Sequence, residues 1–549
     1  MRRRKMVKRS QRVAIWIVVC LMSSLQGIVT AAMPAAGPLR VHPHNPRYFT
    51  DGTENADGSL KAVYLTGSHT WNNLVDMDKA DPPTPFDFEG YLDFLQGHGH
   101  NFIRLWTWDS VTWDTRANGK LGKDFVHHVA PLPWARTGPE EDESGLYSAT
   151  KSLGSISLKN GGAESTDARP GFGREKSKTE IFPSQSRPDS SFSDSGNALD
   201  GKPKFDLTKF SPEYFDRLRA RVRAAGDRGI YVSVMLFEGW GLRHGNRRSG
   251  TPDGWAYRGH PFHPGNNING ITGDLNGDGN VLEIHSLASP AITALQAAYI
   301  RKVVDTVNDL DNVLFEVINE GGEKEWDWWV VKTIQDYERT KPKQHPVGLT
   351  GHGGEKTDSM LASNADWISP GGQDGYRDPA PAWDGRKVSL LDTDHIWGVG
   401  GNHAWVWRSL LRGHNPIFMD PYDGSLLGNR FDPKFELLRR NMGYTRRYAQ
   451  RVNLAAMTPR SELASTQFCL ADPGKEYLVY LPDGGDVTVD LGAVSGELFV
   501  EWFNPRTGET AEGPRVAGGQ KRTFNPPFAG DAVLYLRSAG PGATARPES

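Results

Sequence analysis

VLFEVINEGG, residues 313–322, is the stretch of this sequence that decides the fold. Its apolar, partly β-branched run predicts a strand that is covered on both faces, and the glycine pair ends that strand. Glu320 then stands at the carboxyl end of the strand. In open α/β sheets and (β/α)8 barrels, the loops that carry the chemistry gather at this end. The stretch therefore predicts a buried strand that delivers a carboxylate to a functional surface, whereas an arbitrary Asn-Glu pair would be a solvated turn.

Seven further strand-like segments alternate with amphipathic helices across residues 40–450. Asp87 can cap one such helix, and Ser211-Pro212 begins another. Alternation of this kind predicts a parallel sheet, and eight units favour a closed barrel over an open sheet. A short hairpin at residues 41–51 is expected to cap the barrel floor. The predicted strands are residues 62–69, 101–106, 230–238, 313–320, 345–350, 367–369, 387–392 and 416–419.

The chain of 549 residues is too long for one hydrophobic core and predicts two domains. Beyond residue 454 the pattern changes to short strands with turn signals, which predicts an antiparallel β-sandwich over residues 455–540. Residues 137–197 are rich in polar residues and glycine, so they predict a disordered insertion in a loop of the barrel. The predicted fold class is α/β, a (β/α)8 TIM barrel followed by a small all-β sandwich domain.

Residues 1–32 resemble a secretory signal peptide. Seven Lys and Arg and no acid occupy residues 1–12, an apolar run follows at residues 14–22, and small residues precede residue 33. The apolar run is short for a membrane span, and an uncleaved anchor is the alternative. Cleavage after Ala32 would remove seven of the 63 basic residues, leaving 56 against 66 acidic ones and a net charge of −10. We expect a secreted or periplasmic protein with no stable membrane span after cleavage and no nucleic-acid partner.

The sequence contains two cysteines, Cys20 in the predicted leader and Cys469. After cleavage Cys469 would have no intramolecular partner, so no disulfide framework is predicted. Cys20 follows Val19 where a small residue is expected, which argues against lipidation.

Two carboxyl groups that flank an anomeric carbon can cleave a glycosidic bond, and this sequence places acids at two strand ends. Glu320 is the first. The second comes from the segment 389–395, where Asp392 and Asp394 share parity and both can point into a barrel mouth. Asp394 is better placed because it stands further along the chain. The alternative is that either aspartate is a hydrogen-bonding strut of the barrel rim, and this reading applies more strongly to Asp392.

Other polar and aromatic residues follow the predicted strand ends and are candidates for substrate binding. Arg104 is placed to pair with the nucleophile, and Asn319 is placed to hold a sugar hydroxyl. Indole rings stack on the apolar faces of sugars, although each Trp is as readily explained by the core. The candidate substrate-binding residues are Arg104, Asn319, His69, Trp106, Trp108, Glu238, Trp240, His352, Asp392 and His395.

Residues 274–280 have the D-x-N-x-D-G spacing of a calcium-binding loop. Asp274, Asn276 and Asp278 would be the ligands, but His285 occupies the position where the glutamate is expected. An ordinary Asx-rich turn is the alternative. No His/Cys spacing indicates zinc and no phosphate-binding loop is present, so no cofactor is required, with a structural calcium ion as the one candidate.

The segments Asn-Phe-Ile-Arg at 101–104 and Val-Ile-Asn-Glu at 317–320, with an acid after a later strand, resemble clan A glycoside hydrolases. This resemblance implies Glu320 as acid/base, Asp394 as nucleophile, Arg104 as its partner and Asn319 as the neighbour of the acid/base. The chain departs from the clan at the seventh strand, where the clan has Glu and this sequence has Asp-Thr-Asp-His. Within the clan the chain is similar to apiosidase-like, cellulase-like barrels that end in a module named for collagen binding in a collagenase, on the residues 476–482 and 502–508.

These features predict an exported glycoside hydrolase that acts on a poly- or oligosaccharide. The resemblance implies a retaining mechanism, with carboxyl groups about 5–5.5 Å apart, whereas roughly 6.5–9.5 Å would indicate inversion. Burial and the neighbouring carboxylate are expected to raise the pKa of Glu320. The alternatives are a carbohydrate-binding protein on a barrel without turnover, and a matrix-adhesion protein acting through the sandwich.

Overall fold

A computed structural model describes residues 33–114, 126–137, 196–243, 256–277, 281–351, 357–422, 424, 426–427 and 433–538. The predicted leader, residues 138–195 of the predicted insertion, His352 and Asp278 lie outside these described residues. None of the helices in the described ranges is both long and apolar enough to cross a membrane.

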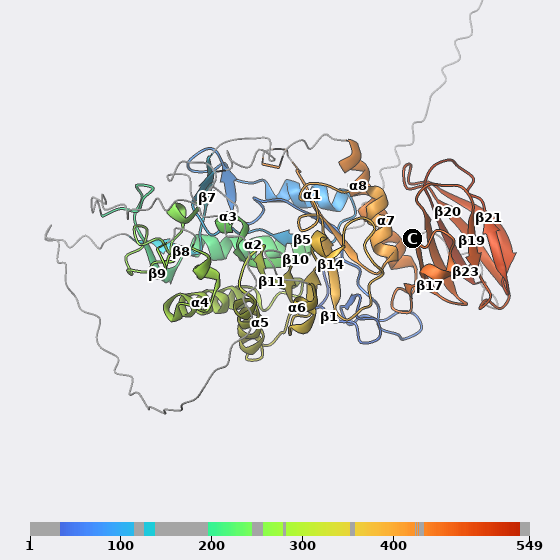
Figure 1. Cartoon of the computed structure of the whole chain (residues 1–549), viewed down its shortest axis with the longest axis horizontal. Helices are drawn as coiled ribbons and strands as arrows, with labels where there is room; N and C mark the ends of the chain where they lie inside the picture. Colours follow the sequence, from blue (N-terminus) through green and yellow to red (C-terminus); the bar gives the residue numbers. More distant parts are fainter. Residues whose placement is uncertain are drawn as a thin grey trace, which may run out of the picture. The chain divides into compact units, whose positions relative to one another are not determined.

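Eight parallel strands form the central sheet, with helices packed around it (Figure 1). The two strands at the ends of the hydrogen-bonded order also meet, because the backbone N–H of Asn101 donates to the Thr66 carbonyl at 3.0 Å. The predicted (β/α)8 barrel is thereby confirmed. In spatial order the strands are β3 (Gly67–His69), β15 (Asn415–Met419), β14 (Val388–Asp392), β13 (Trp367–Ser369), β12 (Val347–Thr350), β11 (Val313–Asn319), β10 (Tyr231–Glu238) and β5 (Phe102–Leu105).

The barrel helices bury one face each. In the first of them the buried residues Phe88, Tyr91, Leu92 and Leu95 follow the helical repeat, and the Asp87 side chain accepts a hydrogen bond from the Gly90 N–H. The helices are α1 (Phe88–Gly97), α2 (Pro212–Asp227), α3 (Trp240–Arg243), α4 (Pro290–Val307), α5 (Lys324–Glu338), α6 (Thr357–Ala362), α7 (His403–Leu411) and α8 (Pro433–Arg451).

A hairpin covers the amino-terminal ends of the barrel strands. Strands β1 (Arg40–Val41) and β2 (Phe49–Thr50) pair in antiparallel fashion. Leu39 and Phe49 pack with residues near the strand beginnings, including Phe102 and Leu314. The predicted floor hairpin is confirmed, and the opposite end of the barrel remains for the functional loops.

The loops after β3 and β5 build two small sheets that the sequence analysis did not predict. Strands β4 (Asp76–Asp78), β6 (Thr112–Asp114) and β7 (Val126–Ala130) form one antiparallel sheet, and β8 (Trp134–Arg136) pairs with β9 (Phe205–Phe210) to form the other. Along the chain, β4 follows the carboxyl end of β3, and β6 to β9 follow the carboxyl end of β5.

The carboxyl-terminal region is a β-sandwich of a six-stranded and a two-stranded antiparallel sheet. Alternate side chains of the larger sheet, such as Val479 and Leu534, pack toward the smaller one. Cys469 is buried and carries a free thiol, as expected. The larger sheet contains β16 (Thr458–Pro459), β17 (Cys469–Asp472), β18 (Glu476–Leu481), β23 (Ala532–Ser538), β20 (Glu497–Phe503) and β21 (Thr510–Ala517), and the smaller contains β19 (Val487–Asp490) and β22 (Lys521–Phe524).

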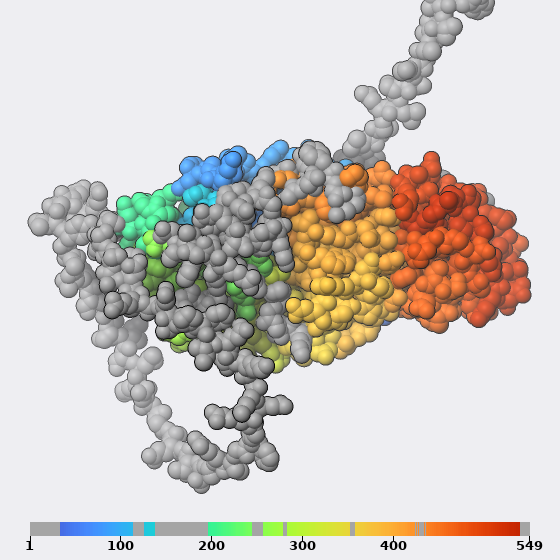
Figure 2. Space-filling model, turned by 45° about the horizontal axis from the view of Figure 1, so that its top comes forward, coloured from blue at the N-terminus to red at the C-terminus, as the bar shows by residue number. Residues whose placement is uncertain are grey.

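The other face of the six-stranded sheet is buried against the barrel helices α7 and α8. Leu478, Tyr480 and Phe503 of the sheet share one apolar cluster with Trp407 and Tyr448 of the helices. In Figure 2 the orange surface of these helices continues into the red surface of the sandwich. The central strands of the six-stranded sheet are therefore covered on both faces, by helices on one side and by the two-stranded sheet on the other, whereas the edge strand β21 is largely exposed.

Candidate active site

Glu320 directly follows β11, and its backbone adopts the left-handed conformation, with φ +48°. A non-glycine residue in this region costs roughly 1–3 kcal/mol, and such residues cluster at functional sites. The loops after β10 and β11 meet backbone to backbone here, since a Cβ atom on Gly239 would lie 2.5 Å from the Gly321 Cα atom. The Glu320 residue is only 6% exposed. Packing therefore holds the carboxyl group in one place at the strand end.

Asp392 and Asp394, at the end of β14, differ in their contacts. Asp392 accepts hydrogen bonds from Arg104 at 3.0 Å and from the Asp394 N–H at 2.9 Å, and His69 Nε2 lies 3.1 Å from its Oδ1 atom. Asp394 contacts Arg104 through Oδ2, at 3.1 Å. Asp392 thus accepts hydrogen bonds through both oxygens, as a structural support would. Asp394 lies two residues further along the chain, beyond the end of β14.

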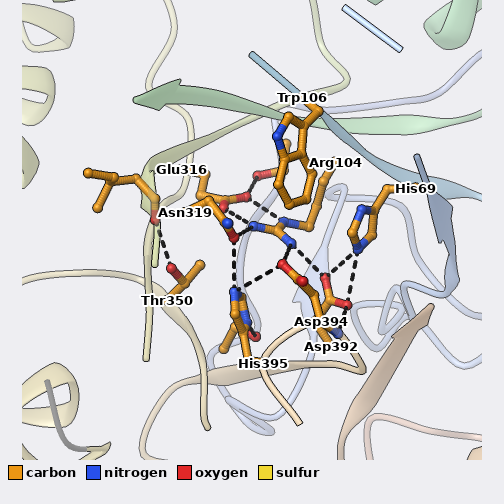
Figure 3. A network of polar contacts seen from close by, with 12 residues as sticks. His69, Arg104, Trp106, Glu316, Asn319, Thr350, Asp392, Asp394 and His395 are labelled. Carbon is orange, nitrogen blue, oxygen red and sulfur yellow. Dashed lines mark hydrogen bonds and ion pairs between the residues drawn. The ribbon is translucent and has the colours of Figure 1, made fainter. Parts of the chain in front are cut away.

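Arg104 connects the carboxyl groups (Figure 3). Its Nε and NH2 groups donate to both oxygens of Glu316, its NH1 group donates to Asp392 and Asp394, and NH2 also donates to Asn319 Oδ1 at 2.7 Å. A guanidinium has five N–H donors, so these five contacts use all of them. Its plane is therefore fixed by side chains from β11 and from the end of β14.

Asn319 and His395 form a second chain of contacts beside the arginine (Figure 3). His395 Nε2 lies 3.2 Å from Asn319 Oδ1, and His395 Nδ1 lies 2.8 Å from Ser369 Oγ. The tautomer with its proton on Nε2 donates to Asn319 and accepts from the serine hydroxyl. Because Oδ1 of Asn319 is held by Arg104 and His395, the amide group has a defined orientation next to Glu320.

The carboxyl groups have different pKa values. Burial raises the pKa of Glu320 well above its usual range, and the charges of Asp394 and Glu238 raise it further. Burial also raises the pKa of Asp394, while Arg104 acts in the opposite direction. Burial would raise the pKa of Asp392 as well, but His69 and Arg104 hold it well below the usual range. The pKa values of Glu320 and Asp394 are thus both raised, and that of Asp392 is lowered, so Asp392 is the carboxylate that the site holds ionised.

Glu320, Asp394 and His395 each place one donor atom within 4.8 Å of the others. This spacing resembles that of metal-binding side chains, but a cation already lies at the site, because the guanidinium of Arg104 is 3.1 Å from Asp394. The nearest oxygen atoms of Glu320 and Asp394 therefore face each other across a short gap, as two carboxyl groups that flank one sugar carbon must.

The predicted calcium loop is described only in part. Asp274 is half-buried and Asn276 is exposed, both within a turn. Asp278 lies outside the described residues, so the calcium site stays a prediction.

The predicted aromatic platforms lie mostly in the core. Trp106 and Trp108 are 1% and 2% exposed. Trp106 stacks on His69 at a centroid distance of 5.3 Å, and Trp108 Nε1 donates to the Trp71 carbonyl. Trp240 is half-buried at the start of α3 and is the candidate with a partly accessible ring. The core explanation thus holds for two of the three.

Glu238 ends β10 and accepts hydrogen bonds from the N–H groups of Trp240 and Gly241, both at 2.8 Å. It therefore caps the short helix α3. Burial raises its pKa well above the usual range. His352, another candidate substrate-binding residue, lies outside the described residues.

The sequence analysis missed three residues of the site. Glu316 and Ser369 bond to the named residues Arg104 and His395, and Ser233 bonds to Glu316. Glu316 had a signal, because it has the same parity as Glu320 on a strand of known direction. The two serines carried none, since a buried serine inside a strand is ordinary.

A cavity of about 590 Å³ lies among the loop sheets, away from the carboxyl pair. Trp134, Arg136, Phe205 and Arg258 are among its lining residues, and neither Glu320 nor Asp394 lines it. Some of its charged groups pair with one another, as Arg136 does with Asp200 and Lys202 with Asp81.

Comparison with known proteins supports this architecture. The family model described as "Putative collagen-binding domain of a collagenase" matches residues 460–537. No curated protein matches the chain. A solved structure titled "Glycoside hydrolase" is similar over 92% of this chain and 98% of its own, with 11% identity and a TM-score of 0.51. A glycoside hydrolase family 5 structure from Bacteroides vulgatus is similar over 93% and 96%, with 12% identity and a TM-score of 0.52.

The class of protein follows from the fold: the chain is a (β/α)8 barrel with a carboxyl-terminal β-sandwich, and its structural neighbours are glycoside hydrolases. The expected resemblance to such barrels is confirmed at the level of fold, and the expected sandwich module is confirmed by the family model.

Proposed function

We propose that this protein is an exported glycoside hydrolase that uses Glu320 and Asp394. The observation that carries the proposal is the pairing of two carboxyl groups, from the ends of β11 and β14, with ligand atoms within 4.8 Å of each other and with Asp394 bonded to Arg104. The shared fold with glycoside hydrolases supports it. A carbohydrate is the proposed substrate.

In the proposed mechanism Asp394 attacks the anomeric carbon while Glu320 protonates the leaving oxygen. Glu320 then takes a proton from the water that hydrolyses the glycosyl ester on Asp394. The raised pKa of Glu320 keeps its proton available above the pH at which an ordinary glutamate ionises. Arg104 favours the charged form of Asp394, so a pair that shares one proton carries it on Glu320. The short separation supports retention of configuration.

Asp392 serves this mechanism as a support. Its carboxylate is held ionised by His69 and Arg104 and accepts the N–H of Asp394, which fixes the backbone of the nucleophile. Asn319, held by Arg104 and His395, is placed for a hydroxyl beside the reacting carbon.

For the sandwich we propose a structural role beside the barrel. The description of its family model mentions collagen, but the central strands of the six-stranded sheet pack against the barrel helices on one face and against the two-stranded sheet on the other. This packing supports a role in stabilising the barrel. Secretion and a structural calcium ion stay predictions from the sequence.

Hydrolysis across a panel of plant and bacterial glycans tests the proposal. We expect the wild-type protein to release sugar from at least one glycan, and Glu320→Gln and Asp394→Asn to lose about a hundredfold or more in kcat/KM. Glu462→Gln, an exposed glutamate of the sandwich region, is the matched control and should keep full activity. Saturable glycan binding without hydrolysis by wild type would move the reading to a carbohydrate-binding protein.

A further inference from the structure

Glu316 is a buried carboxylate in the middle of β11, four residues before Glu320. It has no exposed surface. Its Oε2 atom accepts from Arg104 Nε at 3.0 Å and from Ser233 Oγ at 3.2 Å, and its Oε1 atom accepts from Arg104 NH2. A buried carboxylate is costly unless it is paired and hydrogen-bonded, and here both requirements are met by a single arginine and one hydroxyl.

The contact with Glu316 determines which N–H groups of Arg104 remain for the residues of the active site. Glu316 takes two of the five N–H donors in a fork geometry, and this fixes the guanidinium plane. The remaining donors point to Asp392, Asp394 and Asn319 (Figure 3). Without Glu316 the same arginine could turn and bind Asp394 through two parallel hydrogen bonds, which would withdraw the carboxylate from attack.

We propose that Glu316 is a positioning residue that acts through Arg104 to limit the hold of the arginine on Asp394. The inference rests on the proposed function, because it concerns the nucleophile of that reaction. Glu316 itself lies below the reacting atoms and touches no substrate position.

The negative charge of Glu316 also affects Asp394, because it offsets the positive charge of Arg104. Arg104 is one cation among several carboxyl groups, and Glu316 neutralises it at close range in a buried setting where such pairs are strong. Asp394 therefore feels less positive charge than a lone arginine at 3.1 Å would supply. The charged and titratable groups that face Asp394 are Arg104, Asp392, His69, Glu320 and His395, with Glu316 behind the arginine.

The test compares Glu316→Gln with Glu316→Asp. The glutamine variant removes the charge at nearly constant shape, so Arg104 should bind Asp394 more strongly and keep it ionised to lower pH. We expect the acid limb of the pH profile of kcat/KM to move to lower pH, with kcat reduced about tenfold to a hundredfold and KM little changed. The aspartate variant keeps the charge but breaks the fork. Its acid limb should stay near that of wild type while kcat falls.

Glu338→Gln is the matched control, because Glu338 is an equally buried glutamate on α5 that pairs with His345 and lies outside the site. It should leave the acid limb unchanged. A double-mutant cycle of Glu316→Gln with Arg104→Lys adds a second reading. If Glu316 acts through Arg104, the two losses are strongly non-additive. Additive losses would contradict the proposal, as would an acid limb that does not move in Glu316→Gln.

An infrared titration of the protonated carboxyl band keeps the inference separate from the proposed function. The band that Asp394→Asn removes should titrate at lower pH in Glu316→Gln than in wild type, whether or not a substrate is known. If the band shifts and no glycan is cleaved, the proposed function fails and the inference about Arg104 and Asp394 stands. If glycans are cleaved and the band titrates at the same pH in both proteins, the inference is wrong and the glycosidase proposal stands.

Discussion

Asp392 and Asp394 are two residues apart and have opposite surroundings. His69 and Arg104 hold the pKa of Asp392 well below its usual range, which makes it a permanent anion of the site wall. Asp394 accepts a hydrogen bond from the NH1 group of Arg104, and burial raises the pKa of Asp394. The sequence placed both acids at one strand end but left both readings open, because parity gives direction and not hydrogen-bond partners.

At the residue scale, we expect Glu320→Gln to stabilise the fold at neutral pH. The folded-state pKa of Glu320 is raised above the usual 4.5, so its carboxyl contribution is fully present below about pH 4.5 and is lost as pH rises toward the folded-state pKa. Glutamine cannot ionise and loses nothing. Urea denaturation at pH 4 and pH 8 checks this.

The free energy of unfolding of Glu320→Gln minus that of wild type should be larger at pH 8 than at pH 4. Equal differences at the two pH values would show that the group is not held protonated by its surroundings. Hydrogen bonds lower the pKa of Glu462, so the same difference for Glu462→Gln should not become larger at pH 8 than at pH 4.

At the scale of elements, the strands that carry the site were readable and the loops above them were not. β11 was predicted almost to the residue, because a continuous apolar run ended by two glycines has one strong explanation. The first strand was predicted over residues 62–69 but pairs only over Gly67–His69. Strands β4 and β6 to β9 and helix α8 were missed. The small loop strands are short and gain their pairing from tertiary contacts, and α8 is a strongly polar helix whose apolar stripe is narrow.

Gly67 of β3 shows how the barrel closes. A Cβ atom there would lie 1.9 Å from the Phe102 carbonyl oxygen of β5, so only glycine permits this approach. We expect Gly67→Ala to lower the free energy of unfolding by about 1–3 kcal/mol or more, since neither backbone can move away cheaply. Urea denaturation measures the loss.

Gly97→Ala is the control for that substitution. Gly97 ends α1, and a Cβ atom there would meet nothing within 4 Å. Alanine should raise stability by roughly 0.5–1 kcal/mol. A neutral Gly67→Ala would mean that the strands do not approach as closely as described.

At the scale of the whole molecule, the barrel and the sandwich share an apolar cluster. Trp407 of α7 contacts Tyr448 of α8 and Tyr480 and Phe503 of the sandwich, with ring centroids 5.7–6.3 Å apart. His403 Nε2 of α7 also lies 3.0 Å from Asp531, a residue of the sandwich region. The sequence predicted two separate domains. The sequence could not predict the shared cluster. The apolar residues of β18 indicate that both faces of the strand are buried, but they do not indicate which element covers each face.

We therefore expect one cooperative thermal transition for the barrel and the sandwich together. Trp407→Ala should lower the free energy of unfolding by about 3–5 kcal/mol and shift that single transition. Calorimetry measures it, with Trp328→Ala on α5, a half-buried tryptophan remote from the sandwich, as the milder control. Two transitions in wild type, of which Trp407→Ala shifts only one, would contradict a shared core.

The central claim is a double displacement by Glu320 and Asp394, and the anomeric configuration of the first product tests it most directly. The measurement is proton NMR during the first minutes of hydrolysis, on a glycan that the wild-type protein cleaves. The account predicts that the newly formed sugar appears with the configuration of the substrate and only later mutarotates, because attack by Asp394 and then by water inverts the anomeric carbon twice. A first product of inverted configuration would contradict it.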